Sequence, residues 1–152
     1  MTPAPTDPST PPKEAWSRQE LDQNPHRSSE KAGKVRAMFA SISASYDLNN
    51  RLHSFGRDQA WRRQAVRLAE VGPEDLVLDV ACGTGDLTEA FAAAGASRVV
   101  GGDFTPEMLD HARRKALRLP ADRRPTYEHA DAMHLAYEDA SFDVVSIAFG
   151  IR

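Results

Sequence analysis

The sequence has a single cysteine, Cys82, so the chain cannot form an internal disulfide. Disulfides are rare in the reducing cytoplasm, and we expect a cytoplasmic protein. Basic residues show no excess, because 19 Lys and Arg stand against 22 Asp and Glu, and this balance disfavours a nucleic-acid partner. The longest nearly continuous apolar run, residues 144–151, is too short to cross a bilayer. The five histidines lack the spacing of zinc ligands, so we expect no metal site.

Proline is distributed unevenly, and this divides the chain. Six of the ten prolines fall in residues 1–30, among Ser, Thr and Asp. Such a segment buries too little apolar surface to offset its ordering entropy, so we predict a disordered tail. Residues 31–72 then show helical apolar spacing and are expected to form an N-terminal helical cap or lid. Residues 73–152 are expected to form an α/β domain.

Within the cap, residues 58–72 predict an amphipathic helix that ends at a Gly-Pro pair. Trp61 and Leu68 fall on one face with two alanines, and we expect this face to be buried. The arginines between positions 62 and 67 line the other flank. They are interpreted as a solvated face, with contact to anionic lipid as the alternative.

Strands and helices alternate after residue 73. Apolar runs predict strands, and helical spacing predicts helices between them. Thr105 and Pro106 carry the signals of a helix start. This alternation is typical of a parallel sheet with covering helices, an open α/β fold. The expected strands are 76–81, 98–103, 126–130 and 142–149, and the expected helices are 86–94 and 106–117.

The stretch "DVACGTGD", residues 79–86, joins the first strand to its helix. Open α/β sheets bind ligands beyond the carboxyl ends of their strands, and the glycines allow a sharp turn and a close backbone approach. Asp103 follows Gly83 by twenty positions and ends the second strand. A carboxylate there can accept hydrogen bonds from both ribose hydroxyls, so we predict a ligand that contains a ribose.

The same loop argues against a dinucleotide. Thr88 stands where the dinucleotide fingerprint has its third glycine. Asp86 directly follows the second glycine, and with Asp79 it would repel a pyrophosphate. Negative charge at this point suits a cationic amino-acid end, which indicates S-adenosylmethionine as the ligand.

Several segments resemble known methyltransferase motifs. "VLDVACGTGDL", "VVGGDFTPEML" and "YEHADAMHLAYEDASFDVV" are similar to the motifs of class I S-adenosylmethionine-dependent methyltransferases. "VRAMFASISASYDLNNRLHSFGRDQAWRR" and "FDVVSIAFGIR" resemble the ubiquinone/menaquinone biosynthesis C-methyltransferases. The resemblance covers residues 35–152. The chain departs from this family's pattern at Asn49, His53, Asp58 and Ala148.

The resemblance implies a Rossmann-like fold and roles for individual residues. The glycine loop would line the methionine and ribose, Phe104 and Met108 would enclose the adenine, and Asp131 would accept from its amino group. The implied cofactor-binding residues are Asp79, Gly83, Thr84, Gly85, Asp103, Phe104, Met108, Asp131 and Ala132. The implied catalytic residues are Tyr46 and Asp47, in a lid over the reacting centre, and Arg152, which would face the acceptor ring.

The reaction that the resemblance implies is methylation of a ring carbon on a prenylated quinol, from demethylmenaquinol to menaquinol. A ubiquinone precursor, or another small molecule or lipid, is the alternative acceptor. The family continues beyond the last residue here, so we expect the first half of the domain, with strand 142–149 as an open edge. An inactive fragment is the non-enzymatic alternative. Contact with the inner face of the membrane and homo-oligomerisation are left open.

Packing is the simpler interpretation of some candidate residues. Tyr46 and Trp61 are expected to pack in the core, because aromatic residues at helical spacing usually do. Cys82 is expected to be a small loop residue and not a nucleophile. His129 and His134 are expected at the surface.

Overall fold

The computed structural model describes residues 31–43, 46–47, 52, 54–55 and 57–148. The chain divides into two compact units, residues 1–38 and 39–152. Helix α2, Lys31–Ile42, contains the described part of the first unit. The predicted disordered tail, and Asn49, His53 and Arg152, lie outside the described residues.

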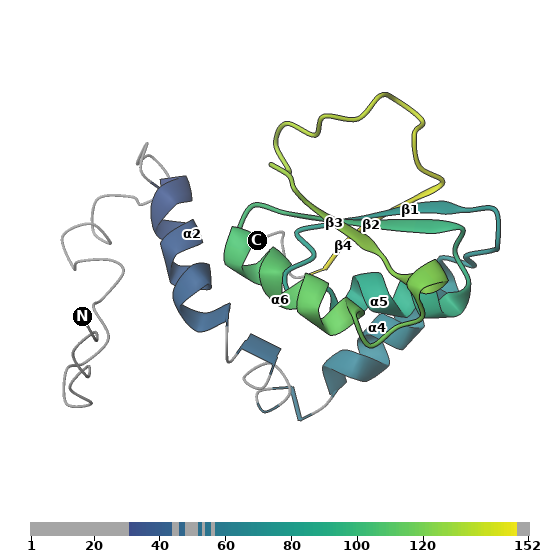
Figure 1. Cartoon of the computed structure of the whole chain (residues 1–152), viewed down its shortest axis with the longest axis horizontal. Coiled ribbons are helices and arrows are strands. Elements are labelled where there is room, and N and C mark those ends of the chain that lie inside the picture. The colour runs from purple at the N-terminus through teal and green to yellow at the C-terminus, as the bar shows by residue number, and fades with distance from the viewer. Residues whose placement is uncertain (1–30, 44–45, 48–51, 53, 56, 149–152) are drawn as a thin grey trace. The chain divides into compact units, whose positions relative to one another are not determined.

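The second unit contains a parallel sheet with the strand order β3-β2-β1-β4 (Figure 1). Asp79 is in register with Gly101 on β2 and with Ser146 on β4, so the ends of these strands lie next to one another. The sheet confirms the predicted parallel α/β fold. Its strands are β1, Leu76–Val80; β2, Arg98–Asp103; β3, Thr126–His129; and β4, Val144–Ile147.

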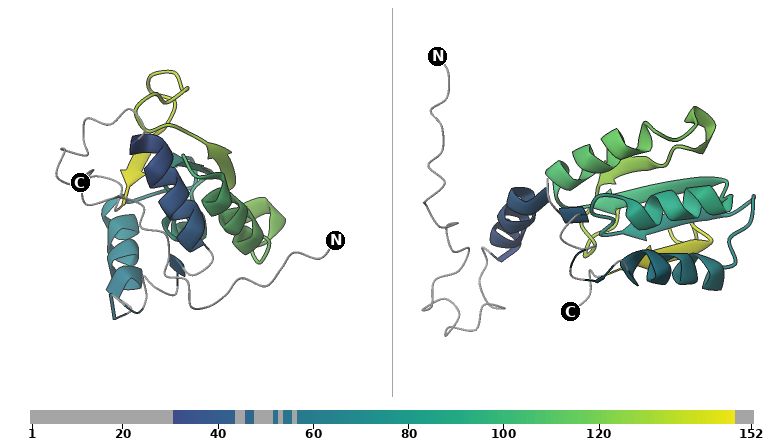
Figure 2. Two further views of the ribbon diagram at one scale, coloured as in Figure 1. Left: turned by 90° about the vertical axis from the view of Figure 1, so that its left-hand side faces the viewer. Right: turned by 90° about the horizontal axis from the view of Figure 1, so that it is seen from below.

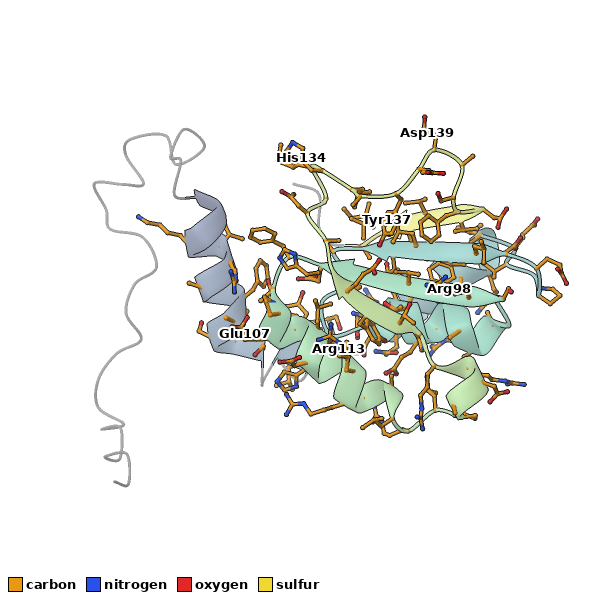
Figure 3. All side chains as sticks on the ribbon, turned by 45° about the horizontal axis from the view of Figure 1, so that its top comes forward. Arg98, Glu107, Arg113, His134, Tyr137 and Asp139 are labelled. Carbon is orange, nitrogen blue, oxygen red and sulfur yellow. The ribbon has the colours of Figure 1, made fainter. Side chains whose placement is uncertain are left out.

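Three helices lie side by side on one face of the sheet, as Figures 1 and 2 show. The opposite face is covered by the connection between β3 and β4. Tyr137, labelled in Figure 3, and Phe142 pack from this connection against Leu78, Val80 and Val100. The helices are α4, Arg57–Leu68; α5, Asp86–Ala94; and α6, Pro106–Ala116, and a short 3-10 helix, Ala121–Arg123, precedes β3.

Helix α5 lies beneath the centre of the sheet and runs between two glycines. Gly85 and Gly95 flank it with φ values of 82° and 103°, in the left-handed region that glycine adopts without steric cost. Leu87 and Phe91, one turn apart, are buried against Val77 and Val99. The packing of this apolar stripe fixes the start of α5, and with it the end of the glycine loop.

Helix α4 buries a different face from the one that the sequence predicts. Trp61 is 50% exposed and Leu68 is 76% exposed, so their expected burial is wrong, although Ala69 on the same predicted face packs against the core. Asp58 is instead buried, and the Arg62 side chain is only 11% exposed. Arg62 pairs with Asp58 and with Asp86, so it is not part of a solvated face. Arg62 therefore lies beside the end of the glycine loop, where α5 begins with Asp86.

Strand β4 pairs with β1 and has no second neighbour within the described part of the chain. Its Val145 is 61% exposed. The expected open edge is therefore present in the described sheet. No helix among the described residues is long and apolar enough to span a bilayer.

Candidate functional site

The glycine loop joins the end of β1 to the start of α5. Gly83 and Gly85 have φ values of 56° and 82°, so the backbone reverses in a conformation that favours glycine. Cys82 donates its N–H to the carbonyl of Gly102 at 3.1 Å, and Gly85 donates to the carbonyl of Cys82 at 2.9 Å. These bonds hold the loop against the end of β2.

Asp103 at the end of β2 ties the loop to the next helix. One oxygen of its carboxylate accepts the N–H of Gly83 and the other accepts the N–H of Thr105, both at 2.8 Å. Asp103 is 9% exposed. Each carboxylate oxygen has two lone pairs, so each keeps one acceptor position for a ligand hydroxyl.

Asp79 is buried at the centre of the sheet's carboxyl end. Thr88 and Ser146 donate their hydroxyls to its carboxylate at 2.7 and 2.8 Å. Burial raises the pKa of Asp79 above its ordinary value, although the two hydroxyls oppose this shift. Thr88, which replaces the dinucleotide glycine, therefore holds Asp79 in place.

Asp86 lies in a group of polar side chains from three helices. Lys115 donates to one of its oxygens, and Gln59 donates to the other at 3.2 Å. Arg62 lies 3.5 Å from the same carboxylate. Burial alone would raise the pKa of Asp86, but these partners outweigh it and hold the pKa below the ordinary value. Asp86 is therefore ionised, as the sequence analysis assumed, but its charge is largely paired within the protein.

Tyr46 and Asp47, the two residues of the expected lid, lie beside the glycine loop. Asp47 accepts a hydrogen bond from the Thr84 hydroxyl and another from Lys115, the latter at 2.9 Å. Tyr46 is half-buried and meets Phe39 edge-on, with 6.2 Å between the ring centroids. The structure thus brings both residues to the glycine loop from more than thirty positions away in the sequence.

A small hollow of about 30 Å³ lies between the lid and the loop. This volume holds one or two water-sized groups. Its acidic lining consists of Asp79, which accepts the hydroxyls of Thr88 and Ser146, and Asp86, which is already paired with Lys115 and Arg62. The lining residues are Tyr46, Arg62, Asp79, Ala81, Cys82, Gly83, Thr84, Asp86, Leu87 and Ala148.

The remaining expected contacts follow β2 and β3. The Phe104 ring is about one third exposed and lies 5.3 Å from the ring of His129, whereas Met108 is buried. Asp131 is partly exposed, and its carboxylate accepts the N–H of Met133 at 2.9 Å, which lowers its pKa. Ala132 is exposed beside it. Phe104, Asp131 and Ala132 are accessible at the ends of β2 and β3, whereas Met108 has little surface to offer a ligand.

Tyr127 was not predicted to contribute to the site. Its ring on β3 packs beneath Gly101 and Gly85, where an added Cβ would lie 2.8 Å from the ring and 2.4 Å from its hydroxyl, respectively. Both positions therefore need glycine to admit Tyr127. The glycine pair within β2 was the available signal, because glycine inside a strand often marks a close approach.

Cys82 lies inside the loop but is not activated. Burial, and then the negative charges of Asp79 and Asp103, raise the pKa of its thiol. A thiol of this kind stays protonated at neutral pH, so Cys82 does not act as a nucleophile. His129 and His134 are exposed, as expected.

The sequence matches the model of the ubiE/COQ5 methyltransferase family over residues 27–152. The chain belongs to this family. Within the family pattern, the departure at Asp58 is accompanied by its buried pairing with Arg62.

Curated relatives carry names from the same family. The chain is 45% identical to a demethylmenaquinone methyltransferase of Clavibacter sepedonicus, covering 82% of this chain and 49% of the relative. It is 48% identical to one of Deinococcus radiodurans, covering 81% and 51%. It is 45% identical to the ubiquinone/menaquinone biosynthesis C-methyltransferase UbiE of a Geobacter species, covering 82% and 54%. The chain spans about half the length of these relatives.

Solved structures support the same fold. A putative methyltransferase of Haloferax volcanii, in complex with the Trm112 activator, is similar with a TM-score of 0.57 at 25% identity, covering 72% of this chain and 46% of that one. The magnesium protoporphyrin IX methyltransferase of Synechocystis, solved with bound SAM, gives a TM-score of 0.53 at 29% identity, covering 59% and 43%. The sheet of this ubiE/COQ5 family member is therefore of the Rossmann-like methyltransferase type.

Proposed function

We propose that the protein transfers a methyl group from S-adenosylmethionine to a ring carbon of demethylmenaquinol. The observation that carries this proposal is the family membership, together with relatives named demethylmenaquinone methyltransferase. A glycine loop between two buried aspartates at the carboxyl ends of adjacent strands supports the same assignment.

The site residues fit S-adenosylmethionine. Asp103 keeps acceptor positions for two ribose hydroxyls, and Phe104 offers a ring face for the adenine. The hollow beside Asp79 has the size for an ammonium group, and we assign the Asp79 carboxylate as its acceptor. We assign Asp131 to accept a hydrogen bond from the adenine amino group, with Ala132 next to it in the sequence.

When bound, S-adenosylmethionine supplies a sulfonium that is already a good leaving group. The protein then has to align the acceptor carbon with the methyl group and sulfur, and to favour the deprotonated ring hydroxyl that activates this carbon. We assign the alignment to the lid residues Tyr46 and Asp47. We assign stabilisation of the phenolate to Arg152. Arg152→Ala should lower turnover strongly and leave S-adenosylmethionine affinity nearly unchanged, and an unchanged turnover would reject this role.

The acceptor is tested by supplying methyl-labelled S-adenosylmethionine with either of two quinols. We expect label in menaquinol when demethylmenaquinol is the acceptor. A ubiquinol precursor is the second candidate, since one relative carries both quinones in its name. Label in that product alone would replace the first assignment, and label in neither would reject quinol methylation. A prenylated acceptor would also bring the protein to the inner face of the membrane, which sedimentation with quinol-loaded vesicles would test.

A further inference from the structure

Lys115 differs from the other basic residues at the end of α6. Its side chain is 17% exposed, and its ammonium contacts two carboxylates, those of Asp47 and Asp86. Arg114, its neighbour, is exposed and donates its Nε–H to the carbonyl of Asp110 on its own helix. The position of Arg114 is that of an ordinary basic residue at a solvated helix end. Lys115 differs, because its ammonium group is largely shielded from solvent between two carboxylates.

The two partners of Lys115 come from different elements around the glycine loop. Asp86 is the first residue of α5, where the loop ends, and Asp47 belongs to the lid. Asp47 also accepts the hydroxyl of Thr84 within the loop. One ammonium group therefore connects the lid, the start of α5 and the end of α6.

The charges explain why a cation is needed at this point. Asp47 and Asp86 are both acids within reach of one ammonium group, and like charges this close repel each other unless a cation lies between them. Asp86 has further partners in Arg62 and Gln59. Among the described residues, Asp47 would keep only the hydrogen bond from the Thr84 hydroxyl. Loss of Lys115 therefore acts mainly on the lid.

We propose that Lys115 is a positioning residue that holds the lid, through Asp47, against the cofactor site. This inference rests on the proposed function for its catalytic meaning. Lys115 does not line the hollow itself, so it acts through the position of Asp47 and of Tyr46, which does line it.

The test compares Lys115→Gln with Arg114→Gln, a loss of the same charge one residue away. We expect Lys115→Gln to weaken S-adenosylmethionine binding about tenfold by isothermal titration calorimetry, an effect typical of coupling between sites. Lys115→Arg should restore most of the affinity because it keeps the cation. Arg114→Gln should bind like the parent protein. A Lys115→Gln affinity equal to that of Arg114→Gln, even with a lowered melting temperature, would overturn the proposal and leave only a structural role.

Asp47→Asn removes the ion pair between Asp47 and Lys115 by changing the lid residue instead of the lysine. An asparagine side chain still offers an oxygen to Thr84 but no charge to Lys115. We expect this variant to lose the same affinity, and Lys115→Gln to add less than a further twofold change in its background. Full additivity of the two substitutions would contradict the proposed connection.

Hydrogen exchange separates this inference from the proposed function. The amides of Tyr46 and Asp47 should exchange faster in Lys115→Gln and in Asp47→Asn than in Arg114→Gln, with or without S-adenosylmethionine. If the parent protein does not bind S-adenosylmethionine, the proposed function fails, and faster exchange still supports the connection between Lys115 and the lid. Unchanged exchange in both variants would overturn that connection.

Discussion

The hydroxyl of Thr88 lies 2.7 Å from the carboxylate of Asp79, and both side chains are buried. This contact joins the first turn of α5 to the end of β1, across the glycine loop. Thr88→Val keeps the shape of the side chain but leaves a buried carboxylate oxygen without this donor. We expect a loss of about 1–3 kcal/mol in the free energy of unfolding, measured by urea denaturation.

The control for Thr88 is Thr126→Val, at the exposed start of β3. That substitution should change the unfolding free energy by less than about 0.5 kcal/mol. Equal losses at the two threonines would show that the bond to Asp79 contributes nothing specific.

Gly85 and Gly95 flank the same helix and separate two effects of a side chain. Gly95 has open space around it, so Gly95→Ala meets only the cost of its positive φ, about 1–2 kcal/mol. A Cβ on Gly85 would lie 2.4 Å from the Tyr127 hydroxyl. Gly85→Ala should therefore lose about 1–3 kcal/mol more than Gly95→Ala in urea unfolding. Similar losses would mean that Tyr127 does not pack under the loop.

The stability that Asp86 contributes should depend on pH. The pKa of Asp86 lies below its ordinary value of 3.8 in the folded protein, so the ionised form stabilises the fold. This contribution is complete above pH 3.8 and is lost as the pH falls through the folded-state pKa. Asp86→Asn should be less stable than the parent protein at pH 7, and the difference should shrink below pH 3.8 in thermal melts. A gap that stays constant down to acid unfolding would contradict the paired state of Asp86.

The elements nearest the site were predictable because local signals mark their ends. Strand Arg98–Asp103 and helix Asp86–Ala94 match the prediction at both ends, since glycines flank the helix and a charged residue bounds each end of the strand. Local signals did not show which side chains of α4 are exposed and which are shielded. Arg62 is largely shielded from solvent and pairs with Asp86 on another helix, and a hydrophobic period contains no information about such a partner.

Part of the candidate site was also predictable from the sequence. Asp79, Asp103 and the glycines follow from the loop motif and the rule for strand ends. Ser146 and Tyr127 do not, because their contacts depend on which strands are neighbours in the sheet. Lys115 falls within the predicted helix 106–117, but the helical pattern gives no sign of its contacts with Asp47 and Asp86, which depend on the folded chain.

The proposed function depends most on S-adenosylmethionine binding at the glycine loop with Asp103 as the ribose ligand. Calorimetric titration of the protein with S-adenosylmethionine and, separately, with NAD tests this directly, with Asp103→Asn beside the parent. An asparagine has one acceptor oxygen, so it cannot hold both backbone N–H groups and a ribose, and hydrogen bonds to a charged group contribute about 1.5–3 kcal/mol. We expect saturable binding of S-adenosylmethionine, no binding of NAD, and a loss of about 10- to 100-fold in affinity in Asp103→Asn. Binding of NAD in place of S-adenosylmethionine would contradict the proposed cofactor, and an unchanged affinity in Asp103→Asn would contradict the role of Asp103 as the ribose ligand.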